Sequence, residues 1–145
     1  MLTNQLGFKM EKYLLDTDIS VFYLRGKYDI NQRLKEIIGY DNCFISEITL
    51  AELKYGAELS EKVNENLISV NEFANRIGIL PIFNSLDLYA KEKARLKRMG
   101  NLIDDFDLLI GCSAIRNGLI LVTNNENHFE RIENIMMENW IKNKI

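Results

Sequence analysis

Residues 13–18 read Tyr13-Leu14-Leu15-Asp16-Thr17-Asp18, an apolar run that ends in two carboxylates one residue apart. Such a run is typical of a buried β-strand. If the strand stays extended through Asp18, both acids point the same way, because side chains alternate between the two faces of a sheet. In open α/β sheets, ligands bind outside the carboxyl ends of the strands. Asp16 is therefore a candidate site residue on which other residues are expected to converge.

The size and charge of the chain limit its class. It has 145 residues, 47% of them apolar, which predicts one domain with a sizeable core. Because Met10 leads straight into the first strand, we expect a single domain over residues 10–145 and an N-terminal extension over 1–9. The net charge of −3, from 18 basic and 21 acidic residues, excludes a general polycationic nucleic-acid binder but allows a local basic face.

Cysteine usage and hydropathy indicate a cytoplasmic protein. Cys43 and Cys112 are flanked by apolar residues and lack the spacing of a zinc site, so we expect reduced core thiols. No apolar run approaches the length of a bilayer span, and residues 1–9 lack the apolar segment of a secretory signal. The sequence therefore predicts no membrane association.

Strand-like and helix-like segments alternate along the chain. Apolar runs at 43–46, 79–82 and 119–122, and a last one ending near Trp140, are typical of strands. Between them, apolar residues recur at helical spacing and predict helices at 19–24, 30–39, 46–56, 61–77, 85–99, 104–118 and 129–132. This alternation predicts an α/β fold with a central, mostly parallel sheet and helices on both faces.

Particular residues mark the ends of these elements. Ser46 or Thr49 is expected to cap the helix that follows the second strand, and an aspartate is expected to cap the buried helix after residue 104. Gly118 is a good helix stop. Pro81 cannot donate a ladder hydrogen bond, so the strand at 79–82 is expected at an edge of the sheet or to end there.

Acidic and amide side chains gather at these ends. Asp16, the group at 104–107 and Asn125 are expected at one edge of a parallel sheet, and Glu52 could join them from the helix after the second strand. Carboxylates held within a few ångströms repel one another by ~4 kcal/mol per pair at a surface-like dielectric, so such a cluster needs a proton or a cation. Hard oxygen ligands favour Mg²⁺ or Mn²⁺.

Several segments together resemble the PIN-domain ribonuclease toxins of the VapC family. They are 13–19 (YLLDTDI), 45–57 (ISEITLAELKYGA), 107–110 (DLLI), 121–132 (LVTNNENHFERI) and 138–140 (ENW). The resemblance implies a PIN-like three-layer sandwich and Mg²⁺-dependent hydrolysis of RNA phosphodiester bonds by metal-activated water, with Mn²⁺ as a substitute and tRNA as one candidate substrate. It also implies a cognate VapB-like antitoxin, as in type II toxin–antitoxin systems, and a homodimer.

The resemblance also implies site residues. The first acid of the family falls on Asp16, its glutamate on Glu52 and its third acid on Asp107. Asp16 and Asp107 would then bind the metal ion, and Glu52 would complete the site or orient the water. Asn125 stands where many PIN domains have a fourth acid, so one negative charge is lost there.

Other polar residues are expected to have lesser roles. Asp105 is a candidate helper, and Thr123 is expected either to end a strand or to hydrogen-bond an acid of the site. Asp18 is expected to be a helix N-cap rather than a metal ligand. His128, the only histidine, is expected at or near the surface rather than as a general base.

Two surfaces have open interpretations. The basic run at 91–98 is either a solvated helix face or a set of phosphate contacts beside an acidic pocket, and the two readings are equally weighted. Phe22, Tyr23 and Tyr28 are candidates to form the dimer or to receive the antitoxin.

Two other functions remain as alternatives. Residues 16–20 (DTDIS) match the opening of a haloacid dehalogenase-like phosphatase, in which Asp16 would be the nucleophile. That family also needs an aspartate pair after a buried strand, whereas Asp104 and Asp105 follow only two apolar residues, and the chain is short for it. The second alternative is a non-catalytic PIN-like protein whose acidic pocket binds a partner's arginine or a structural cation.

Overall fold

The computed structural model describes residues 11–141 and confirms the α/β class. Its five-stranded sheet has the order β3-β2-β1-β4-β5, and every neighbouring pair is parallel, so the sheet is parallel throughout. The strand that leads into Asp16 is therefore central, and the strand before Pro81 lies at an edge as predicted. The strands are β1 (Tyr13–Leu15), β2 (Cys43–Ser46), β3 (Gly78–Leu80), β4 (Ile120–Val122) and β5 (Met137–Glu138).

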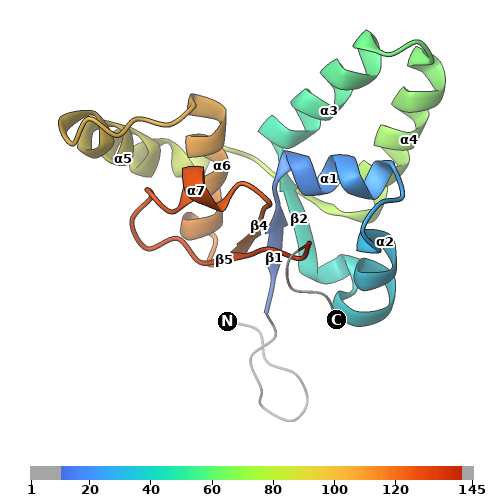
Figure 1. Ribbon diagram of the computed structural model, residues 1–145, viewed down its shortest axis with the longest axis horizontal. Coiled ribbons are helices and arrows are strands. Elements are labelled where there is room, and N and C mark those ends of the chain that lie inside the picture. The colour runs from blue at the N-terminus through green and yellow to red at the C-terminus, as the bar shows by residue number, and fades with distance from the viewer. Residues whose placement is uncertain (1–10, 142–145) are drawn as a thin grey trace.

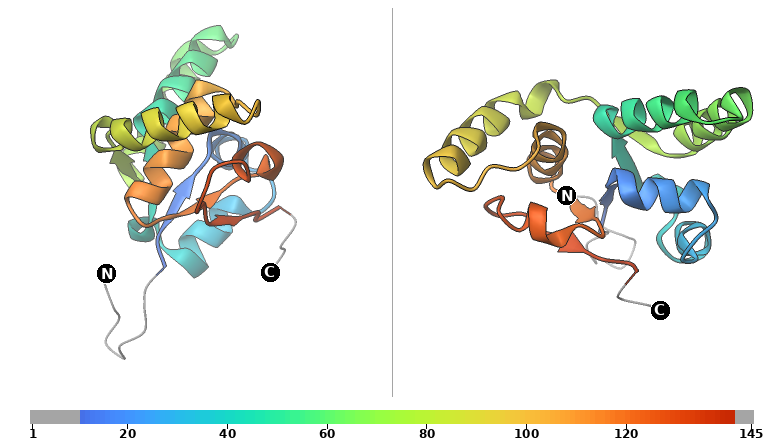
Figure 2. Two further views of the ribbon diagram at one scale, coloured as in Figure 1. Left: turned by 90° about the vertical axis from the view of Figure 1, so that its left-hand side faces the viewer. Right: turned by 45° about the horizontal axis from the view of Figure 1, so that its top comes forward.

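Helices cover both faces of the sheet. Figure 1 shows α1 to α4 on one side and α5 to α7 on the other, and the second view in Figure 2 keeps this three-layer arrangement. The helices are α1 (Thr17–Leu24), α2 (Ile30–Gln32) continuing into the π-helix η1 (Arg33–Ile38), η2 (Tyr40–Asn42), α3 (Glu47–Leu59), α4 (Val63–Arg76), η3 (Phe83–Ser85), α5 (Leu86–Arg98), α6 (Asp105–Arg116) and α7 (Glu126–Phe129).

The core has one part on each face of the sheet. Tyr13 and Leu15 pack into the cluster under α1–α4, whereas Leu14 packs into the cluster under α5–α7. This alternation follows from the pleat of the strand, and burying a leucine contributes about 1.5–3 kcal/mol. Because β1 is buried on both faces, its carboxyl end is held firmly in the middle of the molecule.

Side-chain caps begin two helices close to the predicted acids. Ser46 Oγ accepts a hydrogen bond of 3.1 Å from the backbone of Ile48 and begins α3. Asp104 Oδ2 accepts bonds of 3.1 and 3.4 Å from the backbones of Phe106 and Asp107 and begins α6. Both caps agree with the prediction, in which Ser46 was one of two choices.

The beginning of α1 differs from the prediction. The strand ends at Leu15, and the N-cap of α1 is Asp16, whose Oδ1 accepts a 2.8 Å bond from the backbone of Thr17. The prediction of Asp18 as the N-cap is therefore wrong, because Asp18 already lies in the first turn of the helix. The acidic stretch is a strand end followed at once by a helix, rather than an extended strand.

Two other helix bounds also differ. Helix α3 continues past Gly56 to Leu59, because a glycine inside a helix weakens it without ending it. Helix α7 begins three residues earlier than expected, at Glu126.

Within residues 11–141, no helix is long and apolar enough to cross a membrane. The extension expected over residues 1–9 lies outside the described residues.

Candidate active site

Asp16 lies at the centre of the site. Its backbone N–H donates to the carbonyl of Val122 at 2.9 Å, which continues the pairing of β1 with β4 past the end of the strand. Its side chain is buried, and only 5% of the residue is exposed. Its Oδ1 accepts the bond from the backbone of Thr17, and its Oδ2 accepts a 2.8 Å bond from Thr123 Oγ1. The prediction that Thr123 hydrogen-bonds an acid of the site is confirmed.

Burial raises the pKa of the Asp16 carboxyl to about 8. This value already includes upward contributions from the neighbouring carboxylates of Asp18 and Asp107 and downward contributions from the bonds of Thr123 and Thr17. A buried carboxyl with such a pKa holds a proton near neutral pH unless a cation replaces that proton. The fold therefore places at the end of its central strand an acid that favours a positive partner.

Glu52 lies in the second turn of α3 and contacts Thr17, the residue that follows Asp16. Its Oε1 accepts a 2.8 Å bond from Thr17 Oγ1, and the same hydroxyl lies 3.0 Å from Thr49 Oγ1. Burial raises the pKa of Glu52, and the carboxylates of Asp107 and Asp104 add to that effect. The predicted meeting of Glu52 with the strand-end acid therefore takes place through Thr17.

Asp107 comes to the site from the first turn of α6. Burial raises its pKa, which the nearby His128 lowers in part. His128 Nδ1 lies 3.5 Å from Asp107 Oδ2 and 2.8 Å from the side-chain nitrogen of Asn125. A neutral imidazole nitrogen cannot accept from Asn125 and donate to Asp107 at once, so only one of the two bonds forms in a given tautomer.

Asn125, the N-cap of α7, and His128 within α7 lie together beside Asp107. The backbone N–H of Asn125 donates to Thr123 Oγ1 at 2.9 Å, so Thr123 links Asn125 to Asp16. The side chain of His128 is 49% exposed, as expected of a surface residue, yet it lies beside Asp107. His128 was not predicted as a site residue, and its spacing of three residues from Asn125, about one helical turn, is the sequence signal that points to it.

Asp18 also belongs to this cluster. Its carboxylate accepts bonds of 2.7 Å from the backbone of Ile19 and 2.9 Å from the backbone of Asn124. It therefore ties the first turn of α1 to the loop after β4. Burial raises its pKa, and its charge is the largest electrostatic contribution from a neighbour to the raised pKa of Asp16.

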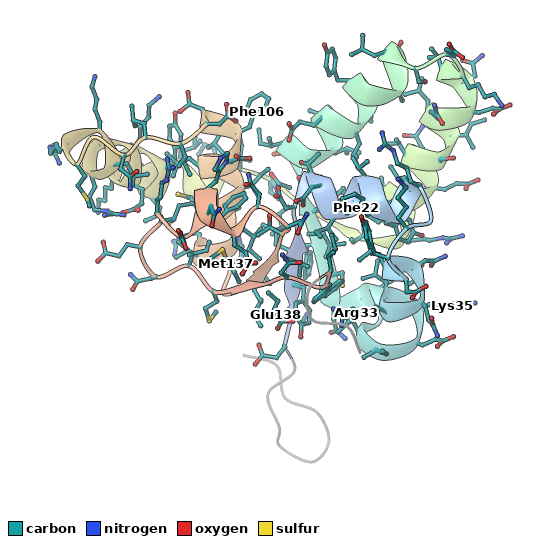
Figure 3. The ribbon with its side chains drawn as sticks, viewed as in Figure 1. Phe22, Arg33, Lys35, Phe106, Met137 and Glu138 are labelled. Atoms are coloured by element: carbon teal, nitrogen blue, oxygen red, sulfur yellow. The ribbon has the colours of Figure 1, made fainter. Side chains whose placement is uncertain are left out.

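Asp105 points away from the cluster. Its Oδ1 accepts bonds of 2.8 Å from Tyr89 and from Lys93 on α5, and these contacts lower its pKa. The structure therefore brings Asp16, Glu52, Asp107, Asn125 and Thr123 together, but it does not bring Asp105 to them. The aromatic neighbour Phe106, at the upper end of α6 in Figure 3, is 47% exposed.

The basic run on α5 divides between paired and exposed side chains. Lys93 pairs with Asp105 at 2.8 Å, and Arg95 binds the nearly buried Glu92 at 2.8 Å and lies 3.6 Å from Glu133. The remaining members are exposed: Lys91, Lys97 and Arg98. Part of the run is thus structural, and the exposed part remains a candidate for phosphate contacts.

The donor set suits a hard divalent cation. Burial raises the pKa of Asp16, Asp18, Glu52 and Asp107, and no ion pair of residues 11–141 joins a lysine or arginine to any of these four. Within the same range, no three His, Cys, Asp or Glu side chains are close enough to hold an ion as they stand. The chemistry therefore fits Mg²⁺, and the side chains have to move closer together to bind it.

The geometry bears on the phosphatase alternative. Both oxygens of Asp16 accept hydrogen bonds and the residue is buried, which does not suit a nucleophile open to substrate. Asp104 and Asp105 begin a helix instead of following a strand. Cys43 and Cys112 are buried free thiols, and burial raises the pKa of each to about 12, so they offer no other nucleophile.

The predicted partner surface lies on another part of the molecule. Phe22, which Figure 3 shows on α1, packs edge-on against Tyr28, with ring centres 4.8 Å apart. Tyr23 stacks on Phe73 at 4.6 Å, and Tyr28 is 53% exposed. A pocket of about 350 Å³ lies beside them and is lined by Tyr28, Asp29, Gln32, Arg33, Ile37, Trp140 and Ile141.

Comparisons with known proteins agree with this fold. A model of the PIN domain matches residues 13–135. Over 134 residues, the chain is 37% identical to the ribonuclease VapC2 of Haemophilus influenzae. This match covers 91% of this chain and 100% of that protein. It is 35% identical over 133 residues to the tRNA(fMet)-specific endonuclease VapC of Shigella flexneri, with 90% of this chain and 99% of that protein covered.

Solved structures give the same result. The chain is similar to one in the crystal structure of DNA-bound VapBC from Salmonella typhimurium, with a TM-score of 0.83, 34% identity and coverage of 90% and 99% of the two chains. It is also similar to a chain of VapBC2 from Rickettsia felis bound to a promoter DNA fragment, with a TM-score of 0.81, 33% identity and coverage of 88% and 98%.

Proposed function

Because the chain belongs to the PIN domain family and, within it, to the VapC ribonucleases, we propose that it is a divalent-metal-dependent endoribonuclease. In this proposal it is the toxin of a type II toxin–antitoxin pair and hydrolyses phosphodiester bonds of RNA. The observation that carries the proposal is the convergence of Asp16, Glu52 and Asp107 at one edge of the sheet without a basic partner among the described residues.

Asp16, Glu52 and Asp107 would hold Mg²⁺, with Mn²⁺ as a substitute. When bound, the metal ion lowers the pKa of water and stabilises the negative charge that develops on the scissile phosphate. Thr123 and the backbone of Thr17 fix the Asp16 carboxylate through one bond to each oxygen. Glu52, held at one oxygen only, has its second oxygen available to orient the attacking water.

Asn125 and His128 complete the site at its open side. Asn125 supplies a neutral amide where an acid would add a charge, and its side chain meets His128 at 2.8 Å. The pair lies at the edge of Asp107, so it is placed to contact the substrate backbone without adding to the repulsion among the carboxylates.

The names of the relatives support a proposal for the substrate and the partners. One relative is named a tRNA(fMet)-specific endonuclease, which makes tRNA the first substrate to examine. The similar solved structures contain VapBC pairs, which supports a small antitoxin as the partner of this chain. We place that partner, or a second copy of this chain in a homodimer, on the surface of Phe22, Tyr23 and Tyr28. We also propose a cytoplasmic protein with a single PIN domain over residues 10–145.

RNA cleavage by purified protein tests the proposal. The wild-type chain, Asp16→Asn and the control Asp41→Asn, which changes an exposed aspartate of η2, are incubated with a total tRNA pool in Mg²⁺ or in EDTA. We expect cleavage by the wild type and by Asp41→Asn in Mg²⁺ only, and none by Asp16→Asn. Cleavage by Asp16→Asn at the wild-type rate would refute the site. Growth inhibition by a chain that cleaves no RNA would favour the non-catalytic alternative.

A further inference from the structure

Thr17 contacts both Asp16 and Glu52. Its backbone N–H donates to Asp16 Oδ1 at 2.8 Å, and its side-chain hydroxyl donates to Glu52 Oε1 at 2.8 Å. Asp16 belongs to the end of β1 and Glu52 to α3, 36 positions apart in the sequence. Helix α1 begins beside the first turns of α3 in Figure 1, so Thr17 lies where these two elements meet.

The hydrogen bonds of this threonine have one direction. A hydroxyl has a single proton, and an ionised carboxylate can only accept, so the Thr17 proton goes to Glu52. Thr49 Oγ1, 3.0 Å away, must then donate to Thr17. Thr49 is fully buried and lies about one turn before Glu52 on α3. The chain of bonds therefore runs from a buried hydroxyl through Thr17 to the carboxylate, and each bond strengthens the next.

The bond from Thr17 restrains a side chain that is otherwise free to move. Among the described residues, the Glu52 carboxylate has no hydrogen-bond partner besides Thr17, and the residue is only partly buried. A glutamate on a helix has three rotatable side-chain bonds, so without this contact its carboxylate would sample several rotamers. With it, one oxygen is fixed, and the other accepts no hydrogen bond among the described residues.

We propose that Thr17 is a positioning residue: its backbone N–H and its hydroxyl together restrain the Asp16 and Glu52 carboxylates near each other, so that less reorganisation of the two side chains is needed when a divalent cation binds. The role parallels that of Thr123, whose hydroxyl holds the other oxygen of Asp16. Groups that orient metal ligands typically change metal affinity or activity by about 10–100-fold when they are removed.

This inference rests on the metal site of the proposed function, but it does not depend on RNA as the substrate. A role in packing alone is the competing explanation, since Thr17 also joins α1 to α3. That role would depend on the shape of the side chain, whereas positioning depends on the hydroxyl. Valine keeps the shape and lacks the hydroxyl, and serine keeps the hydroxyl and lacks the methyl group.

Calorimetric titration of the full chain with Mn²⁺ tests the inference. The variants are Thr17→Val, Thr17→Ala, Thr17→Ser, Thr49→Val and the control Ser69→Ala, which loses an exposed hydroxyl bonded to its own helix α4. We expect Thr17→Val and Thr17→Ala to weaken Mn²⁺ binding by roughly tenfold, and Thr17→Ser to stay within about twofold of the wild type. The Mn²⁺ affinity of Thr49→Val should lie between those of Thr17→Val and Thr17→Ser, and the affinity of Ser69→Ala should match that of the wild type.

Thermal midpoints without metal and RNA cleavage are measured on the same preparations. Thr17→Ala keeps the test open if Thr17→Val does not fold. The inference is overturned if the folded valine or alanine variant binds Mn²⁺ as tightly as the wild type, if Thr17→Ser loses as much as Thr17→Val, or if the wild type binds no Mn²⁺. Weakened Mn²⁺ binding in variants of a chain that never cleaves RNA would uphold the inference and refute the proposed function.

Discussion

The Thr123 hydroxyl donates a 2.8 Å hydrogen bond to Asp16 Oδ2, across 107 positions of the sequence. Both residues are buried at the carboxyl ends of neighbouring parallel strands, β1 and β4. The bond lowers the pKa of an acid whose burial raises it, so it keeps part of the negative charge that a cation needs. The strand order thus determines which hydroxyl reaches the central acid.

Replacing Thr123 tests this relationship. Thr123→Val removes the donor to Asp16 and the acceptor for the backbone of Asn125. Because these groups are buried or partly buried, we expect a loss of about 1–3 kcal/mol in the free energy of unfolding and at least about tenfold weaker Mg²⁺ activation. Thr123→Ser keeps the hydroxyl and should recover most of the free energy of unfolding and most of the Mg²⁺ activation. Denaturant unfolding and cleavage rates measure the two effects, and equal losses in both variants would contradict the role of the hydroxyl.

The raised pKa of Asp16 predicts how stability without metal depends on pH. In the folded protein the Asp16 carboxyl has a pKa of about 8, against a usual value of 3.8. The protonated carboxyl therefore contributes its full stabilisation of the folded state below pH 3.8, and this contribution is lost as the pH rises through about 8. Asp16→Asn can keep the N-cap bond through its amide oxygen and carries no charge. We expect this variant to be more stable than the wild type at pH 8 by on the order of 2 kcal/mol.

Thermal melts of both proteins from pH 5 to pH 8 in EDTA provide the measurement. The wild-type midpoint should fall across this range relative to that of Asp16→Asn, and added Mg²⁺ should restore the wild-type midpoint but not raise that of the variant. Parallel pH curves for the two proteins would show that Asp16 has no raised pKa.

Restoring an acid at residue 125 tests the charge of the site. Asn125→Asp adds a carboxylate near Asp107, so we expect several-fold tighter Mn²⁺ binding. Without metal, the same change should lower the thermal midpoint, because the carboxylates repel one another. Asn127→Asp, on the exposed side of α7, is the matched control. Unchanged Mn²⁺ affinity in Asn125→Asp would place residue 125 outside the reach of the cation.

Asp105 provides a contrast with Asp107 two residues away. The Asp105 carboxylate binds Tyr89 and Lys93 on α5 and is exposed. We therefore expect Asp105→Asn to keep RNA cleavage within about threefold of the wild type, since an exposed ion pair contributes little. The cleavage rates of Asp105→Asn and Asp107→Asn are compared with that of the wild type. A rate as low in Asp105→Asn as in Asp107→Asn would show that Asp105 turns into the site during the reaction.

Sequence patterns predicted the elements because apolar spacing reports burial directly. A buried strand at residues 13–15, Ser46 as one of two candidate caps and an aspartate cap before the buried helix were predicted from residues adjacent in the sequence, and the structure confirms them. Asp18 was assigned wrongly because a cap depends on where the strand ends, and that point is set by the bond from Thr17 to Asp16.

The remaining parts of the site depend on contacts between distant segments. The contact of Thr17 with Glu52 spans 35 positions, and the contact of His128 with Asp107 spans 21. No local spacing encodes such pairs, so the sequence indicated the acids and offered Thr123 as a hydroxyl donor to one of them, but it did not indicate the role of Thr17. The direction of Asp105 likewise depends on Lys93 of another helix.

The central claim is that the converging carboxylates perform metal-dependent RNA cleavage. The most direct test is the rate of RNA cleavage by wild type, Asp107→Asn and the control Asp41→Asn over a range of Mg²⁺ concentrations. We expect the cleavage rate of Asp107→Asn to be at least about 100-fold lower than that of the wild type at saturating Mg²⁺, and the rate of Asp41→Asn to match the wild type. Equal rates for Asp107→Asn and the wild type would contradict it.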